Sequence, residues 1–471
     1  MAEAGNGRAL FAARLTASLM PLNSTMIAVA VPAISHEFHH DPGTVTQALV
    51  ATYLIAAIAL QSPGGKLGDR VGHWRVFGVG QGAIALGAVV GFLAPSLIVL
   101  AGSRLLIAVG GAVVVPATFA LLRIELPPER RGRAFGTFGA VMALAAALGP
   151  ILGGVLVDAF GWRSVFLANL PVLVVSAVLA ASVRHPRPAT VRAPFDWRGS
   201  VLLTGALVLL VLGAQRSDHG AVLLAGAGAV LLVPFVWWER RCEDPVVAFS
   251  LFTHVPFLAG TLVIALQNLV MYALLFELPL VLKSRFDQSA RETGQTLIFL
   301  MLAMVVTSLV AGRLVDRLGA RPLAVLGSLL CVGATTLLVV SDLPSPTSVR
   351  IPLVLLGVGL GLSGPAAQTA SLSAVEQSRS GMAAGLSSTM RYLGGVTGIA
   401  ILGQVLDLDR GRATVLAEHR SALTIFLGAL VLALACAALL PGARDVRVSG
   451  GRRAPSGSRS GSPAGGPGRR S

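Results

Sequence analysis

The feature that most constrains this chain is a succession of apolar runs, each about as long as a bilayer is thick. A helix needs about 20 apolar residues to cross the hydrocarbon, because each residue adds only about 1.5 Å. Charged residues make up 13% of the 471 residues, whereas a soluble domain carries roughly a quarter. We therefore predict an all-α integral membrane protein with about 14 transmembrane helices. The predicted spans are 10–33, 45–62, 76–95, 97–122, 133–157, 164–183, 199–215, 220–237, 256–282, 293–312, 321–340, 350–373, 382–405 and 421–440.

The start of the chain admits two interpretations. Arg8 and Arg14 precede the first apolar run, as basic residues do in a secretory signal peptide. That run, however, continues to about Val31 with no clear small-residue cleavage site. We interpret it as an uncleaved first helix.

Basic residues are concentrated in alternate loops, which predicts the orientation of the chain. Lys and Arg are retained on the cytoplasmic side of a membrane, and an even number of spans puts both termini on one side. We therefore expect both termini to be cytoplasmic in a cell (plasma) membrane. The net charge of +15 then reflects topology, and no nucleic-acid partner is predicted. The basic loops lie within 66–75, 123–133, 184–198, 240–241 and 313–321.

Several function classes find no support in the sequence. The three cysteines, Cys242, Cys331 and Cys436, are far apart and predict neither disulfides nor a zinc site. A run of His and Asp at 36–41 lies in one short loop, where solvated side chains explain it better than a metal does. Nucleotide-binding and hydrolase motifs have no convincing match. We predict a transporter that is not an enzyme and has no cofactor.

An octet of the pattern G-x-L-x-D-R-x-G occurs twice, at 65–72 and 312–319, each time just after the second helix of a group. This repeat predicts a duplicated architecture of six, two and six helices, with a site between the halves near the bilayer midplane. The predicted parts are an N-terminal six-helix bundle at 1–183, a cytoplasmic linker at 184–198, an inserted helix pair and loop at 199–255, a C-terminal six-helix bundle at 256–440 and a disordered basic tail at 441–471.

The octet also predicts a gate at the cytoplasmic membrane edge. A carboxylate there can accept hydrogen bonds from the exposed N–H groups at the start of a facing helix. Glycines allow close approach and a tight turn. The predicted gate residues are Gly65, Asp69, Arg70, Gly72, Gly312, Asp316, Arg317 and Gly319.

Five further segments carry short motifs. They are 22–32 (LNSTMIAVAVP), 149–154 (GPILGG, with Gly136 upstream), 162–171 (WRSVFLANLP), 195–199 (FDWRG) and 391–395 (RYLGG). With the octets, they resemble the major facilitator superfamily and, within it, the fourteen-helix drug:proton antiporter family. The resemblance implies alternating access between two bundles. It also makes Gly149, Pro150, Gly153 and Gly154 the antiporter motif of the fifth span, a bent and leak-tight hinge.

Two positions depart from that family pattern. Asn23 stands where the family usually carries an aspartate associated with proton coupling, and an amide does not titrate near neutral pH. The fourth-helix pattern RxxQGxG is matched only in part, by Arg104 and Gly110. These departures put ordinary proton coupling through the first helix in doubt.

Polar residues within apolar spans are the candidates for the substrate or proton pathway, because burying a charge in a membrane costs at least about 2.5–3.5 kcal/mol. Glu277 is the clearest acid; it either faces the cavity as a replacement proton carrier or reaches outer water and Lys283. Gln267 and Asn268 lie about 100° apart on a helix, so at most one should face the cavity squarely. The set is Asn23, Met26, Tyr53, Arg104, Gln267, Asn268, Glu277 and Arg391.

The other candidates each have a structural alternative. Arg104 could extend outward to water or tune the protonation of a neighbour, and the family resemblance favours the second. Arg391 could brace backbone carbonyls or contact an anionic substrate. Asn23 could bond a neighbouring helix or a substrate, and Tyr53 could offer an aromatic face or merely pack.

We predict a secondary active exporter of small lipophilic molecules, as in drug or antibiotic efflux, driven by protons and functional as a monomer in the lipid bilayer. The scarcity of buried acids favours neutral, zwitterionic or mildly anionic substrates. One alternative is a dedicated exporter, or an uncoupled facilitator, of one endogenous metabolite or lipid. Another is a membrane scaffold or sensor that has lost transport, which sealed packing around Asn23, Gln267 and Glu277 would favour.

Overall fold

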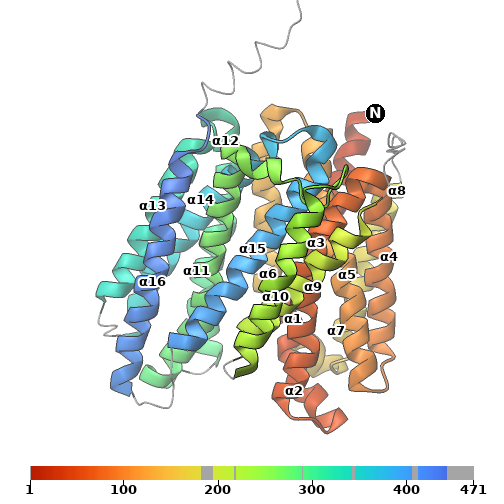
Figure 1. The fold of residues 1–471 in the computed structure, drawn as a ribbon. Helices are drawn as coiled ribbons and strands as arrows, with labels where there is room; N and C mark the ends of the chain where they lie inside the picture. The colour runs from red at the N-terminus through yellow and green to blue at the C-terminus, as the bar shows by residue number, and fades with distance from the viewer. Residues whose placement is uncertain are drawn as a thin grey trace, which may run out of the picture.

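The structure is a computed structural model that describes residues 2–181, 195–216, 219–288, 290–341, 345–405 and 412–442. Within these ranges all regular structure is helical, and the long helices stand side by side (Figure 1). Thirteen helices of the described residues are long and apolar enough to cross a membrane, and α15 (Ser380–Val405) is a further long helix. The predicted all-α membrane fold is thus confirmed. Most of the predicted linker and tail, at 182–194 and 443–471, lies outside the described residues.

The N-terminal bundle contains the first six spans. Its short elements are a helical turn before the second span, the π-helical turn η1 that leads into it, and a turn before the sixth span. The elements are α1 (Ala2–Phe38), α2 (Pro42–Thr46), η1 (Gln47–Ala51), α3 (Thr52–Val71), α4 (His73–Phe92), α5 (Leu97–Glu125), α6 (Pro128–Phe160), α7 (Ser164–Leu167) and α8 (Asn169–Ala181).

The C-terminal bundle repeats this arrangement after an inserted helix pair. The pair is α9 (Trp197–Ala214) and α10 (His219–Glu239), and the short 3-10 turns are η2 (Phe249–Thr253), η3 (Pro346–Val349) and η4 (Gln377–Arg379). The bundle helices are α11 (Val255–Phe286), α12 (Ala290–Leu318), α13 (Ala320–Val340), α14 (Arg350–Ser373), α15 and α16 (Arg412–Ala438).

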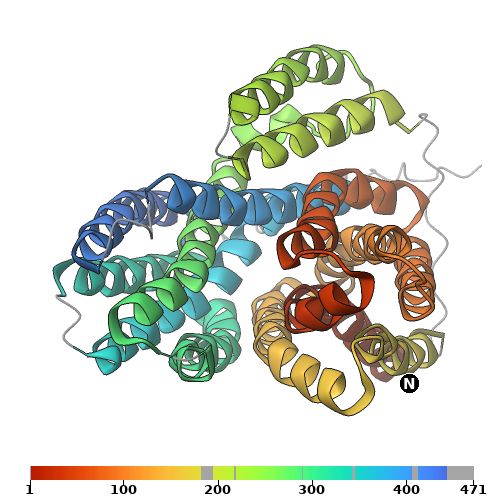
Figure 2. The same cartoon turned by 90° about the horizontal axis from the view of Figure 1, so that it is seen from below.

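Seen along the helices, the two bundles stand next to each other and the inserted pair lies to one side (Figure 2). Among the described helices, α6 packs against α12 and α3 packs against α15, so these pairs join the halves. The inserted helix α9 packs on α3 and, more lightly, on α15. One large buried apolar cluster lies mainly in the N-terminal bundle and extends to the inserted pair and the start of α15. Two clusters lie in the C-terminal bundle, and a small one joins α3 to α9.

Both octets lie at the same end of the molecule, the upper end in Figure 1 and the motif end hereafter. Each octet closes one long helix and opens the next. Gly72 follows α3 with φ of 99°, and Gly319 follows α12 with φ of 86°. Only glycine adopts this left-handed region without strain, so the chain can reverse direction in a single residue.

Candidate functional site

The motif end is closed by two carboxylates, each of which bonds the other half of the molecule. Asp69 at the end of α3 accepts hydrogen bonds from the backbone N–H groups of Gly381 (2.6 Å) and Met382 (2.7 Å) at the start of α15. Asp316 at the end of α12 accepts from Gly132 (2.7 Å) and Arg133 (2.9 Å) near the start of α6. The N-terminus of α15 favours an anion beside Gly381 and Met382, and each carboxylate stabilises one contact between the halves.

Glycines let the backbones approach at both contacts. A Cβ added at Gly65 would lie 2.0 Å from the carbonyl oxygen of Gly381, and one added at Gly312 would lie 2.7 Å from that of Gly132. No side chain fits in either place. Of the two arginines predicted for the gate, Arg70 is half-buried and Arg317 is exposed.

Two further residues strengthen the closure, and sequence reasoning did not select them. The buried Arg123, at the end of α5, donates to the backbone carbonyls of Glu376 (2.9 Å) and Val375 and to the hydroxyl of Ser380. Lys66, inside the first octet, forms an ion pair with Asp244 in the segment that follows α10. Their positions in basic loops were the only sequence signal, and that signal does not identify a partner.

Asn23 is sealed in a reciprocal amide pair inside the N-terminal bundle. Its Nδ2 donates to Oδ1 of Asn169 on α8 (2.6 Å), and Nδ2 of Asn169 donates back to its Oδ1 (3.1 Å). The Asn23 side chain is only 2% exposed. Both amide groups are thereby satisfied between α1 and α8, as a membrane interior requires.

Arg104 is fully buried and does not extend to the surface. Its guanidinium lies 4.3 Å from the ring centroid of Tyr53 and donates to the carbonyl oxygens of Leu49 (3.2 Å) and Asn23 (3.4 Å). The Tyr53 hydroxyl donates to the carbonyl oxygen of Met20 (2.9 Å). The structure therefore brings Arg104, Tyr53 and Asn23 into one network that joins α1, α3 and α5.

Gln267 and Asn268 are divided as adjacent helical residues must be. Gln267 is buried and bonds two helices of its own bundle, donating to Ser328 (3.1 Å) and accepting from Ser363 (2.6 Å). Asn268 is half-buried and donates to the carbonyl oxygen of Ile264 in its own helix (2.8 Å). Asn268 is thus the more accessible of the two.

Glu277 contacts a partner that sequence reasoning missed. Nδ1 of His419 on α16 lies 2.8 Å from Oε1 of Glu277, and neither side chain has any exposed area. Among the described residues, neither Oε2 of Glu277 nor Nε2 of His419 has a hydrogen-bond partner. His419 lies near the start of the last predicted span, and this proximity to an apolar run is the sequence signal that could have made it a candidate.

A group of half-buried polar and aromatic side chains lies between the halves. Arg391 donates to the side chain of Gln368 (2.7 Å) and lies 5.7 Å from the ring centroid of Phe119 in the N-terminal half. The Tyr392 hydroxyl reaches the sulfur of Met20 (3.7 Å), and Tyr272 packs on the α15 backbone at Gly395. The chain has three tyrosines, and Tyr392 lies near both Tyr53 and Tyr272.

The fifth-span motif forms the contact between α6 and α1. A Cβ at Gly149 would lie 1.9 Å from Oγ1 of Thr25, and one at Gly153 would lie 2.8 Å from the carbonyl oxygen of Met26. A Cβ at Gly154 would meet no atom within 4 Å among the described residues. Pro150 lies inside the continuous helix α6. Gly149 and Gly153 therefore fix how closely the two helices pack, and Met26 is buried beneath them.

Comparison with known families agrees with this architecture. A family model described as the Major Facilitator Superfamily matches residues 15–399. The chain belongs to this superfamily of transporters. A multi-pass membrane protein with duplicated six-helix bundles is the arrangement expected of such transporters.

Relatives of this superfamily member include proteins named for resistance. It is 34% identical to the uncharacterised MFS-type transporter YvkA of Bacillus subtilis over 83% of this chain and 88% of the relative. It is 31% identical to the tetracenomycin C resistance and export protein of Streptomyces glaucescens, over 84% and 75%. It is 30% identical to the puromycin resistance protein pur8 of Streptomyces alboniger, over 85% and 81%.

Solved structures support the fold of the superfamily. The human organic anion transporter MFSD10 superposes with a TM-score of 0.68 over 92% of this chain and 99% of that chain, at 17% identity. A bacterial homologue of the iron transporter ferroportin, in an outward-facing state, superposes with a TM-score of 0.65 over 92% and 98%, at 17% identity. At this identity the likeness concerns the fold alone.

Proposed function

We propose that this chain is a proton-driven exporter of small lipophilic molecules that acts as a monomer by alternating access. The resistance and export proteins among its relatives support export. We also assign it to the fourteen-helix drug:proton antiporter family, because the pair α9 and α10 is inserted between two six-helix bundles. The proposed parts remain 1–183, 184–198, 199–255, 256–440 and 441–471, with both termini on the cytoplasmic side of the plasma membrane.

The observation that carries proton coupling is the buried pair of Glu277 and His419. A carboxyl group and an imidazole in contact can hold or release a proton between them, and groups of this kind inside membranes serve as proton relays. Glu277 lies six residues before Lys283, which ends its span, or about 9 Å along the helix. We assign the pair as the proton carrier in place of the first-helix carboxylate that Asn23 does not supply.

The free energy that a proton gains in crossing the membrane is sufficient for export. Moving one proton through about 150 mV supplies roughly 3.5 kcal/mol, which supports a concentration ratio of a few hundred. For the pair to use this drive, it must exchange protons with one side of the membrane at a time. Its complete burial means that this exchange requires a conformation other than the one described here.

The half-buried group between the halves is the proposed substrate site. Tyr272 and Tyr392 combine apolar area with hydrogen-bonding tips, Arg391 adds a positive charge, and we add the half-buried Asn268 to this group. Binding sites for drug-sized molecules are mostly apolar with a few such polar groups. This composition supports neutral, zwitterionic or mildly anionic lipophiles as substrates.

The closed motif end supports alternating access. We propose that it is the cytoplasmic gate, because basic loops gather there and cytoplasmic loops retain Lys and Arg. Substrate from the cytoplasm can then enter only after Asp69 and Asp316 release the helix starts that they bind. Proton uptake at the Glu277–His419 pair would shift the balance between the two states.

The test is transport in proteoliposomes with an imposed pH gradient. Tetracenomycin C and puromycin serve as probes, and a trapped pH-sensitive dye reports proton movement. The wild type should exchange a probe for protons. Glu277→Gln and His419→Gln should lose the dependence on the gradient, because neither glutamine binds or releases a proton near neutral pH.

The matched control is Asp158→Asn, an exposed carboxylate on α6, which should keep both transport and coupling. Should Glu277→Gln transport with unchanged gradient dependence, the proton-carrier assignment is wrong. Transport of either probe without proton movement in the wild type would instead favour the uncoupled facilitator.

One observation favours a second candidate, a membrane scaffold or sensor without transport. Asn23 and Gln267 are 2% exposed and Glu277 is 0% exposed, so all three are sealed by packing in this conformation. A scaffold needs no accessible polar site. The scaffold hypothesis predicts no flux of any probe and no opening of the motif end. A cross-link across that end would then leave the activity of the protein unchanged.

A further inference from the structure

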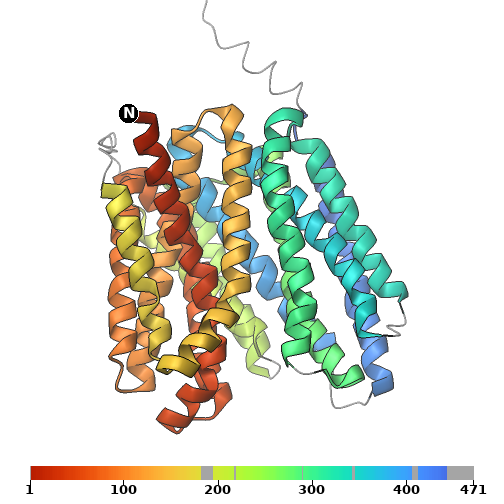
Figure 3. The same ribbon diagram turned by 180° about the vertical axis from the view of Figure 1, so that it is seen from behind.

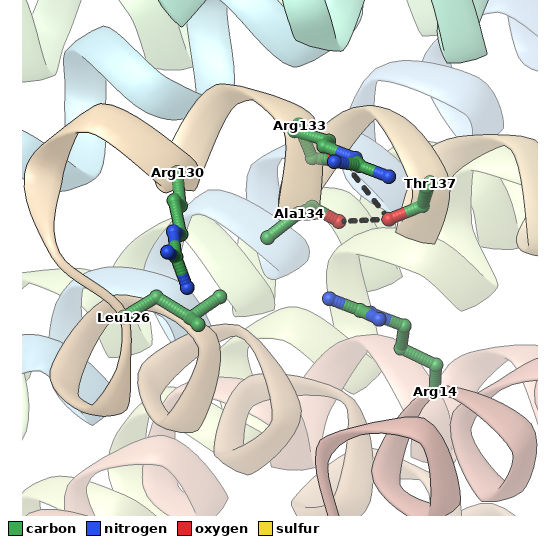
Figure 4. A pocket seen from close by; sticks show the side chains of 6 residues that line it. All are labelled: Arg14, Leu126, Arg130, Arg133, Ala134 and Thr137. Carbon is green, nitrogen blue, oxygen red and sulfur yellow. Dashed lines mark hydrogen bonds between the residues drawn. The ribbon is translucent and has the colours of Figure 1, made fainter. Parts of the chain in front are cut away.

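A pocket of about 580 Å³ lies at the motif end, between α1 and the start of α6 (Figure 4). It is lined by Arg14, Leu126, Arg130, Arg133, Ala134 and Thr137. Three arginines from two helices thus line one hollow. Their side chains belong neither to the contacts made by Asp69 and Asp316 nor to the half-buried group between the halves.

None of the described residues that line the pocket is acidic. Among the described residues, Nε of the half-buried Arg14 has no hydrogen-bond partner. Asp316 on the facing bundle accepts two backbone N–H groups and also attracts the charge of Arg133. Glu129 is exposed in the first turn of α6. The charges of Arg14 and Arg133 repel each other unless an anion lies between them, and guanidinium groups match phosphate oxygens in geometry.

The same face of α6 continues as an apolar stripe. From Arg133 and Thr137 it runs through Leu144 (46% exposed), Leu148 (38%) and Ile151 (55%). These positions are three, four or seven residues apart and share one helix face. The stripe avoids the packed faces of α6, since Gly132 and Gly136 meet α12 and Gly149 and Gly153 meet α1. Seen from behind, α6 stands in the open between those two helices (Figure 3).

We propose that this pocket binds the phosphate headgroup of an anionic glycerophospholipid. The arginines hold the phosphate, and one acyl chain lies along the apolar stripe of α6. A soluble phosphate would use the arginines but would leave the stripe uncovered, so the continuity of charge and apolar surface along one helix face favours a lipid. The bound lipid would join α1 to the start of α6, beside the contact with Asp316.

The test measures lipid binding to the purified protein and does not depend on transport. Native mass spectrometry and thermal unfolding compare phosphatidylglycerol with phosphatidylcholine for the wild type and for Arg14→Gln/Arg133→Gln. We expect phosphatidylglycerol to be retained and to raise the unfolding temperature of the wild type. The double variant should bind it about 30-fold more weakly, the combined contribution of two arginines at an anionic lipid.

Two controls identify the source of the effect. Arg75→Gln/Arg321→Gln removes two exposed arginines outside the pocket and should leave phosphatidylglycerol binding unchanged. Arg14→Lys/Arg133→Lys keeps the charges and should retain most of it, which guards against a folding defect. If the Arg75 and Arg321 pair matters equally, or if soluble glycerol phosphate protects as well as the lipid, the proposal is overturned.

Discussion

At the scale of single residues, two interior amides of the bundles are satisfied by partners on other helices. Asn23 pairs with Asn169, and Gln267 bonds both Ser328 and Ser363. An unsatisfied amide inside a membrane protein is costly. These pairs therefore fix which helix faces which, and removing one partner takes away the hydrogen bonds between the helices that it makes.

The amide pair gives a prediction for stability. Asn23→Ala and Asn169→Ala should each lower the free energy of unfolding by about 1–3 kcal/mol, because each removes both bonds of the pair and leaves the remaining Oδ1 without its donor. The double variant should cost much less than the sum of the two, since it removes both groups. Thermal or denaturant unfolding in detergent measures the cycle. Additive effects would show that the two amides do not interact.

Asn268→Ala is the matched control for this cycle. Asn268 is half-buried and donates to a carbonyl oxygen of its own helix. Its loss should change the free energy of unfolding by less than about 1 kcal/mol. The same variant should weaken probe transport if the half-buried group is the substrate site.

At the scale of elements, α6 has three faces that make different contacts. Its first turns pack on α12 across Gly132 and Gly136, and its second half packs on α1 across Gly149 and Gly153. Its third face carries the arginine pocket and the apolar stripe. Because the three faces are distinct, neighbouring residues of this helix should respond very differently to the same substitution.

Gly153 and Gly154 provide that comparison. A methyl group at Gly153 would meet a backbone carbonyl oxygen 2.8 Å away, which cannot move aside like a flexible side chain. Gly153→Ala should therefore separate α1 from α6 and lower the free energy of unfolding by about 1–3 kcal/mol. Gly154→Ala should be neutral or slightly stabilising, since alanine is the better helix former. Equal melting temperatures for the two variants would contradict the packing described here.

At the scale of the whole molecule, the two halves are held together at the motif end by matched contacts. Asp69 binds the start of α15 and Asp316 binds the start of α6, so each half supplies one carboxylate and one helix start. A single broken contact leaves the other in place. Opening this end therefore requires both contacts to separate, which is expected of two bundles that rock as rigid bodies.

A cross-link tests whether this end must open. A Cβ at Gly139 on α6 would lie 4.0 Å from Oγ of Ser308 on α12, within reach of a disulfide. In a background with Cys242, Cys331 and Cys436 replaced by serine, Gly139→Cys/Ser308→Cys should cross-link on oxidation. Probe transport should stop and should return on reduction. Full transport by the cross-linked protein would rule out opening at this end.

The sequence by itself determined the number, type and order of the membrane helices and the class of transporter. The length and composition of the apolar runs report directly on the bilayer, so all fourteen predicted spans have a matching helix. The duplicated octets also placed Gly72 and Gly319 where the chain turns with positive φ. These features are local, because each depends on one segment of the chain and on the lipid or water around that segment.

Only the tertiary structure decided which interior groups meet. Glu277 and His419 are 142 residues apart, and Asn23 and Asn169 are 146 apart. The residues that bond Arg123 lie in the other half of the chain. An apolar span shows that it enters the membrane, but it does not show which neighbour each face meets. That choice depends on close packing between helices, where a single glycine or buried amide decides the partner.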